Sequence, residues 1–170
     1  MTNYIALLRA VNVGGTGKLP MTELAAMCEG CGFAKVKTYI ASGNVVFQSG
    51  KSEAQVKKAL EAALAEYAGK PVGAMVRTAA EMAAVLAANP FPERAGNATV
   101  AIFLDAAPPA DAFEKVTGQK DEECRLGLRE IYVHYGAGMG TSKLKIAAAK
   151  NGTARNMNTV AKLAEMAGKL

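Results

Sequence analysis

The sequence predicts an α+β protein made of two packed ferredoxin-like (split βαβ) halves with antiparallel or mixed sheets. The first half, at 1–77, shows the order strand, helix, strand, strand, helix, strand, which is the split βαβ order. The second half, at 78–170, shows a weaker copy of that order. The length of 170 residues only slightly exceeds the roughly 100–150 residues of a common domain, so two small subdomains that share a core are expected.

The first strand, loop and helix follow from local composition. The nearly continuous apolar run at 4–11 is typical of a buried strand. Glycines crowd the loop at 12–18, and Pro20 suits the first turn of a helix that ends near Glu29. The other predicted elements of this half are strands at 36–40, 45–47 and 72–76, a tight turn at Ser42–Asn44, and a helix between the capping box Ser52–Gln55 and Gly69.

The second half contains a second capping box at Thr78–Glu81, from which a helix runs to Ala88. Apolar runs and turn residues predict the rest. These elements are a strand at 99–104, a short helix at 108–116, an antiparallel pair at 124–128 and 131–135, and helices at 143–150 and 154–167.

Composition excludes several classes of protein. With 51% hydrophobic and 21% charged residues the chain resembles a globular protein and not a disordered one. No uncharged run approaches the roughly 18 apolar residues of a membrane span. The first residues lack the basic and apolar regions of a signal peptide, and three cysteines fit a reducing compartment, so a cytoplasmic location without membrane contact is expected.

Positive charge is concentrated near the C-terminus. The last 35 residues carry six basic side chains and one acidic one, a net charge of +5 that equals the net charge of the whole chain. Such a concentration produces a local positive field that attracts phosphates. The alternative is that these lysines only keep alanine-rich helices in solution.

Neither glycine-rich loop contains a nucleotide-binding motif. A P-loop ending at Gly17-Lys18 would need glycine at Asn12 and a hydroxyl at Leu19, and the dinucleotide pattern fails as well. The first loop still offers Gly14, Gly15 and Lys18 to an anion. The second offers Ser142 and Lys143 at a predicted helix start. For both loops, a simple turn or a capped helix is the alternative.

The segment 153–159 places several polar residues in the first turns of the predicted last helix. Capping explains two of them, whereas an arginine at a helix N-terminus runs against the helix dipole. Arg155 is therefore expected to contact a carboxylate or phosphate. The partner is either a ligand or an internal carboxylate such as Asp105 or Glu130.

Two other features give weak chemical signals. Cys28 and Cys31 form a C-x-x-C at a helix C-terminal end, where the dipole opposes the thiolate. A zinc site would need Cys124 and His134 in addition. His134 is the only histidine, which excludes a two-histidine metal site, and it has no obvious nucleophile nearby in the sequence, which argues against catalysis. No metal ion and no cofactor are therefore expected. The strands also lack the alternating aromatic residues of an RNA-recognition motif.

Several blocks of the chain, in order, resemble the domain of unknown function 1697 family. The blocks are Tyr4–Gly15, Leu19–Met21, Gly32–Phe33, Thr38–Phe47, Ser142–Leu144 and Thr153–Val160. The resemblance implies a mainly bacterial protein with ferredoxin-like α/β subdomains and implies no reaction. Ala10 stands where the family usually has glycine, and Met157 where it usually has tryptophan. If that tryptophan binds a ligand, this chain binds it more weakly; if it packs in the core, methionine replaces it adequately.

The leading functional hypothesis is non-catalytic binding of a phosphate-bearing ligand, either a nucleic acid or a nucleotide, in a basic cleft. The alternative is an enzyme acting on a small phosphorylated or carboxylated metabolite, with His134 or Asp105 as the titratable group. A protein-binding scaffold would instead show a large exposed apolar patch. The sequence does not fix the oligomeric state. The candidate ligand-binding residues are Arg9, Asn12, Gly14, Gly15, Lys18, Ser42, Asn44, Ser142, Lys143, Arg155 and Asn156.

Overall fold

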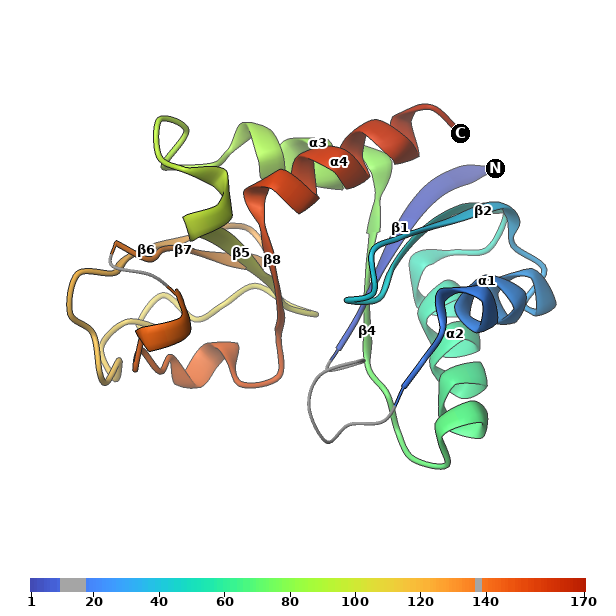
Figure 1. Cartoon of the computed structure of the whole chain (residues 1–170), viewed down its shortest axis with the longest axis horizontal. Helices are drawn as coiled ribbons and strands as arrows, with labels where there is room; N and C mark the ends of the chain where they lie inside the picture. The colour runs from blue at the N-terminus through green and yellow to red at the C-terminus, as the bar shows by residue number, and fades with distance from the viewer. Residues whose placement is uncertain (10–17, 137–138) are drawn as a thin grey trace. The chain divides into compact units, whose positions relative to one another are not determined.

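The computed structural model describes residues 1–9, 18–136 and 139–170 (Figure 1). It divides into two units, one formed by Met1–Ala83 with Lys162–Leu170 and the other by Ala84–Ala161. Each unit contains one four-stranded sheet in which all neighbouring strands run antiparallel. The α+β class predicted from the sequence is therefore confirmed. The division after Ala83 falls six residues beyond the predicted one, and the last nine residues belong to the first unit.

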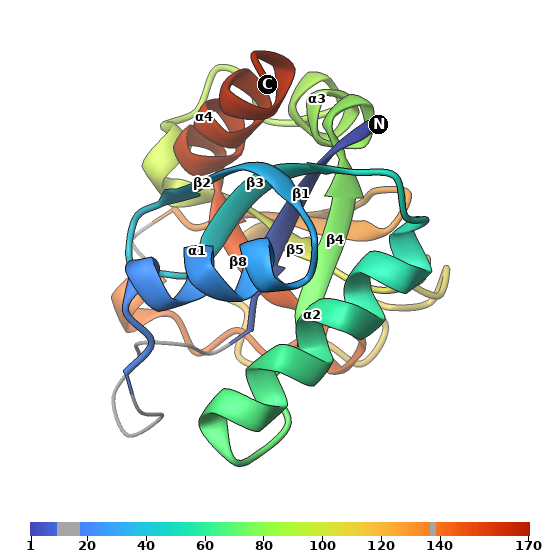
Figure 2. The ribbon, with the colours of Figure 1, turned by 90° about the vertical axis from the view of Figure 1, so that its right-hand side faces the viewer.

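The strands and helices of the first unit follow each other in the predicted order, strand, helix, strand, strand, helix, strand. Its sheet has the order β2-β3-β1-β4, and Figure 2 shows both of its complete helices on the same face of that sheet. The elements are β1 (Thr2–Leu8), α1 (Met21–Gly30), β2 (Ala34–Tyr39), β3 (Asn44–Ser49), α2 (Glu53–Ala68) and β4 (Ala74–Thr78).

Period-two alternation on the strands and helical spacing on α1 and α2 build one apolar core. Leu24 of α1 and Leu60 of α2 pack with Ala6 and Phe47 of the sheet. The predicted capping box is present at the start of α2, where the Ser52 hydroxyl accepts a hydrogen bond from the Gln55 N–H at 3.3 Å.

The second unit has the strand order β6-β7-β5-β8, which repeats the order of the first sheet. Its strands are β5 (Thr99–Phe103), β6 (Glu123–Leu126), β7 (Glu130–His134) and β8 (Thr153–Asn156). Helices α3 (Ala79–Ala87) and α4 (Met157–Gly168) follow β4 and β8, respectively, and each has residues in both units. The predicted antiparallel pair is confirmed as β6 and β7.

The predicted helices at 108–116 and 143–150 are wrong. The first is a series of turns, and only Ala147–Ala149 of the second forms a short 3-10 turn. The backbones of Thr117 and Lys145 instead hydrogen-bond to each other in both directions, at 3.1 and 2.8 Å, which holds both segments extended at that point. Their apolar side chains, Phe113, Val116, Leu144 and Ile146, still pack on the sheet as helices would.

The predicted start of the last helix is also wrong. Residues Thr153–Asn156 form β8, which pairs with β5 from Phe103 to Val100, and the helix begins only at Met157. Thr153 and Arg155 alternate with more exposed neighbours, a period-two pattern that suits an edge strand. The polar crowding in this segment therefore belongs to a strand and to a cap rather than to the first turns of a helix.

Candidate anion-binding pocket

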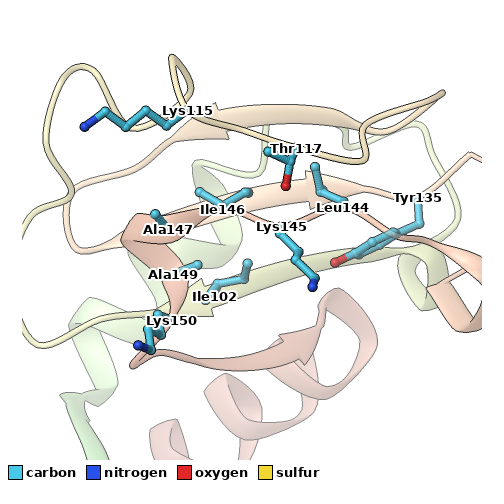
Figure 3. Close-up of a pocket in the computed structure, with 10 residues that line it drawn as sticks. All are labelled: Ile102, Lys115, Thr117, Tyr135, Leu144, Lys145, Ile146, Ala147, Ala149 and Lys150. Atoms are coloured by element: carbon cyan, nitrogen blue, oxygen red, sulfur yellow. The ribbon is translucent and has the colours of Figure 1, made fainter.

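A pocket of about 450 Å³ lies in the second unit, against the face of the sheet that carries Ile102 and Tyr135 (Figure 3). Its size falls within the range of small-molecule sites, roughly 300–1,000 Å³. Three lysines, two hydroxyl side chains and an apolar floor line it. These residues are Ile102, Lys115, Thr117, Tyr135, Leu144, Lys145, Ile146, Ala147, Ala149 and Lys150.

Two segments that are far apart in the sequence form the walls. The backbone bridge between Thr117 and Lys145 joins them, and the Ser142 hydroxyl donates a hydrogen bond of 2.6 Å to the Glu122 carboxylate close by. Gly118 has a φ of +71°, and a Cβ atom at this position would lie 2.0 Å from the carbonyl oxygen of Lys143. Only glycine permits so close an approach in that backbone conformation.

The floor belongs to the apolar core of the second unit. Ile146 is buried and packs with Val100, Ile131 and Val133, while Ile102 is partly exposed to the pocket. Strand period two explains the arrangement, because Ile102 pairs with Ile131 and both side chains point to the same face. The floor therefore packs on the sheet, whereas the lysines belong to the two wall segments, which have little regular secondary structure.

The described residues that line the pocket carry positive charge and include no carboxylate. Lys115, Lys145 and Lys150 contribute ammonium groups, and neither Lys115 nor Lys145 forms an ion pair within the described part of the chain. In the view of Figure 3, the Lys145 amino group points toward the Tyr135 hydroxyl. Such a surface attracts anions and offers them donors.

Tyr135 remains a neutral donor at physiological pH. Burial raises the pKa of its phenol, and the neighbouring Cys124 and Glu122 raise the pKa further. The protonated hydroxyl can donate one hydrogen bond to an anion. It cannot serve as a general base near neutral pH, because it carries its proton there.

The predicted site residues Ser142 and Lys143 lie beside this pocket and not in its lining. They border a neighbouring depression together with Gly118–Glu122. The Ser142 hydroxyl donates its hydrogen bond to the Glu122 carboxylate and accepts one from the Leu144 N–H at 3.2 Å. Lys143 is exposed.

Arg155 and Asn156 belong to β8. Arg155 and Tyr132 both pair with Ala101, so their side chains share the face of the sheet opposite to that of Ile102. The Arg155 guanidinium donates to the Thr153 hydroxyl at 2.8 Å and to the Ala154 carbonyl at 2.9 Å. Burial lowers the pKa of Arg155 to about 10.

Asn156 is the N-cap of α4, since its side-chain oxygen accepts the Thr159 N–H at 2.9 Å. Met157, the position usually held by tryptophan in the resembling family, is buried with only 4% of its surface exposed. Its burial favours the core interpretation of that position over the ligand-stacking one.

Of the predicted site residues of the first unit, Arg9, Ser42 and Asn44 lie at one end of its sheet. The backbone N–H of Arg9 donates to Gly73 at 2.9 Å, and the Leu8 N–H donates to Gly43 at 2.8 Å. Asn44 is buried and donates to the Ser42 hydroxyl at 2.9 Å and to the Tyr39 carbonyl. Lys18 is exposed, and Asn12, Gly14 and Gly15 lie outside the described residues.

The cysteines and the histidine lie outside the lining of this pocket. Burial raises the pKa of Cys28 to about 12, and its thiol is free, like those of Cys31 and Cys124. The ring of His134 is buried and lies within 2.9 Å of the Thr99 hydroxyl. Among the residues that the structure describes, no three His, Cys, Asp or Glu side chains could together hold a metal ion, and no helix is long and apolar enough to cross a membrane.

Sequence reasoning missed Lys115, Thr117 and Tyr135. Tyr135 continues the alternating apolar face of Ile131 and Val133. A tyrosine hydroxyl at the end of that face is the one feature of the sequence that could have marked Tyr135 as a candidate lining residue. The bridge that brings Thr117 to Lys145 joins residues 28 positions apart and leaves no local pattern.

Comparisons with known proteins identify the family. Residues 1–132 match the family described as protein of unknown function DUF1697, and the chain belongs to this family. A solved structure, that of the conserved bacterial protein SP0830 from Streptococcus pneumoniae, is similar over 98% of both chains, with 28% sequence identity and a TM-score of 0.81. No curated protein matches the chain.

Proposed function

Starting from a family that has no assigned activity, we propose that this protein binds a small anionic ligand without catalysis, in the pocket of its second unit. A phosphate-bearing molecule such as a nucleotide belongs to this class. The single observation that carries the proposal is the lining, in which three lysines and a neutral tyrosine hydroxyl surround an apolar floor with no carboxylate among them. An excess of positive over negative side chains in a concave site favours an anion.

The size and the floor of the pocket favour a small molecule over a long nucleic acid. A polynucleotide is held by charges distributed along a groove and by exposed aromatic side chains on which bases stack. Here three lysines line a hollow of about 450 Å³, and among the described residues that line it only Tyr135 is aromatic.

The same lining favours binding over an enzymatic reaction. None of its ten residues is Asp, Glu, His or Cys, and the raised pKa of Tyr135 keeps that phenol protonated. General acid–base catalysis requires a group that exchanges its proton near the working pH. His134 and Asp105, the titratable groups expected for an enzyme, are not among the lining residues.

We propose further that the first unit is a ferredoxin-like domain and that the second is a degenerate copy. The βαββαβ order of the first unit and the strand order shared by the two sheets support this relationship. In the second unit, turns stand where the first has α1 and α2. A cytoplasmic location is also proposed, and the three free cysteines support it.

The test compares the affinities of Lys145→Gln and the natural protein for inorganic phosphate, measured by isothermal titration calorimetry. Loss of one charge-assisted contact should weaken inorganic phosphate binding about tenfold, because such contacts contribute about 1.5–3 kcal/mol before solvent screening. The control Lys58→Gln makes the same change of charge on the exposed surface of α2 and should bind as the natural protein does. Equal affinity of Lys145→Gln and the natural protein would contradict the proposal.

Lys143→Gln separates the prediction made from the sequence from the one made from the structure. The sequence places Lys143 among the ligand-binding residues, whereas the pocket is lined by Lys145. The proposal expects Lys143→Gln to retain most of the affinity that Lys145→Gln loses. The reverse order would move the site to the neighbouring depression.

A further inference from the structure

We infer that the ligand is an amphipathic phosphomonoester, with its phosphate between Lys145 and Tyr135 and its apolar substituent on Ile102 and Ile146. This inference rests on the proposed anion site and adds the class and the orientation of the ligand. It follows from an uneven distribution of polar and apolar groups around the pocket.

The polar end of the pocket is formed by Lys145 and Tyr135. Figure 3 shows the Lys145 amino group and the Tyr135 hydroxyl pointing toward one another, while the amino groups of Lys115 and Lys150 lie at the other side of this view. Burial and the neighbouring Glu122 keep the Tyr135 phenol protonated, so it donates to an oxygen anion. An ammonium and a hydroxyl supply two separate donors for one phosphate.

The apolar end is larger than an inorganic anion requires. Ile102, Leu144 and Ile146 form the floor with Ala147 and Ala149, and only Ile146 of these is buried. The others therefore retain apolar surface that a ligand can cover. Burying roughly 60 Å² of a ligand's apolar surface at ~25 cal/mol per Å² corresponds to about tenfold tighter binding.

The cations favour a dianion over a carboxylate. The described lining residues include three lysines and no acidic residue, and neither Lys115 nor Lys145 forms an ion pair with a described residue, so a doubly charged head group matches the local field better than a singly charged one. The described lining residues include lysines and no arginine, and lysine binds a phosphate without a fixed bidentate geometry. Lysine is a point charge that suits a tetrahedral phosphate.

The experiment compares phenyl phosphate, inorganic phosphate and benzoate by isothermal titration calorimetry on the full chain at one ionic strength. Phenyl phosphate is expected to bind about tenfold more tightly than inorganic phosphate, because its ring covers the floor. Benzoate, which has the ring but only one negative charge, is expected to bind more weakly than phenyl phosphate by a similar factor.

Two substitutions test the orientation. Tyr135→Phe keeps the ring and removes only the hydroxyl, and it should weaken phenyl phosphate about fivefold. Lys145→Gln should weaken it about tenfold, and Lys58→Gln should leave it unchanged. Circular dichroism and the thermal midpoint of each variant confirm that it remains folded, so a loss of affinity reports the missing contact.

The possible results separate this inference from the proposed function. Equal affinities for phosphate and phenyl phosphate, both reduced in Lys145→Gln, would overturn the amphipathic ligand and leave the anion site intact. Benzoate binding as tightly as phenyl phosphate would overturn the phosphate head group alone. Failure of Lys145→Gln to weaken any of the three ligands would overturn both proposals.

Discussion

At the scale of single residues, Arg155 stands in a different element from the one that the sequence predicts. The sequence predicts a helix start, whereas Arg155 lies on β8 and is 8% exposed. Its guanidinium donates to a threonine hydroxyl and a backbone carbonyl. The contact with a carboxylate or phosphate stays a prediction. Desolvation of the cation lowers its pKa to about 10.

Arg77 repeats this arrangement in the first unit. It is 1% exposed and donates to the carbonyl of the preceding residue, Val76, at 3.0 Å. Like Arg155, it stands one residue before the cap of a helix, because the Thr78 hydroxyl accepts the Glu81 N–H at 3.1 Å. The common position at the end of β4 and β8 supports the proposed duplication of the two units.

Glu122 and Ser142 form the second residue-scale feature, and they predict a pH effect. The Ser142 hydroxyl is the main cause that lowers the pKa of the Glu122 carboxyl below its ordinary value of 4.5. A carboxyl with a lowered pKa stabilises the fold above its ordinary pKa, and this contribution is lost as the pH falls through the lowered value. Ser142→Ala should raise the pKa and make the loss of stability in acid shallower.

The Glu122 pKa is measured by NMR titration of the side-chain carboxyl carbon, together with unfolding free energies from about pH 3 to pH 6. Ser142→Thr keeps a hydroxyl and serves as the matched control, in which the pKa should stay low. An unchanged Glu122 pKa in Ser142→Ala would show that the backbone N–H groups of Lys120 and Glu122 and the charge of Lys120 maintain the shift without the hydroxyl.

At the scale of elements, the sequence predicted those whose signal is local. The capping boxes at Ser52 and Thr78 and the apolar periodicity behind them marked α2 and α3 correctly. The segments 108–116 and 143–150 failed because their conformation is set by the distant bridge between Thr117 and Lys145. β8 failed for the same reason, since its partner β5 lies some fifty residues earlier.

Gly118 provides the test of this long-range packing. Its positive φ and the backbone oxygen of Lys143 leave no room for a Cβ atom, so Gly118→Ala should lower the free energy of unfolding by about 2 kcal/mol. The backbone around Lys143 must shift to make room for the new Cβ atom, and this shift would move the pocket wall that carries Lys145. The affinity for phosphate should therefore fall as well. Urea denaturation and calorimetry measure the two effects.

Gly140→Ala is the control for that substitution. Gly140 belongs to the same unit, and a Cβ atom there would meet nothing within 4 Å. Its free energy of unfolding should change by no more than about 0.5 kcal/mol. Equal effects of the two substitutions would show that the close approach at Gly118 does not support the pocket wall.

At the scale of the whole molecule, the sequence predicts a basic ligand site, and the pocket proposed from the structure lies only partly in the segment that suggested it. Lys145 and Lys150 of its lining belong to the positively charged last 35 residues. Lys115 and Tyr135 could not be added from the sequence, because the fold alone brings them to those lysines. The predicted residues Arg9, Ser42 and Asn44 belong to the first unit, and their role in binding stays a prediction.

The central claim is that small anions bind against the sheet of the second unit, and NMR mapping tests it most directly. Inorganic phosphate is titrated into ¹⁵N-labelled protein while the backbone amide signals are followed. The account predicts that the largest shifts fall on Thr117, Tyr135, Lys145 and Ile146. Shifts that instead cluster at Arg9, Ser42 and Asn44, or that show no saturation at any residue, would contradict it.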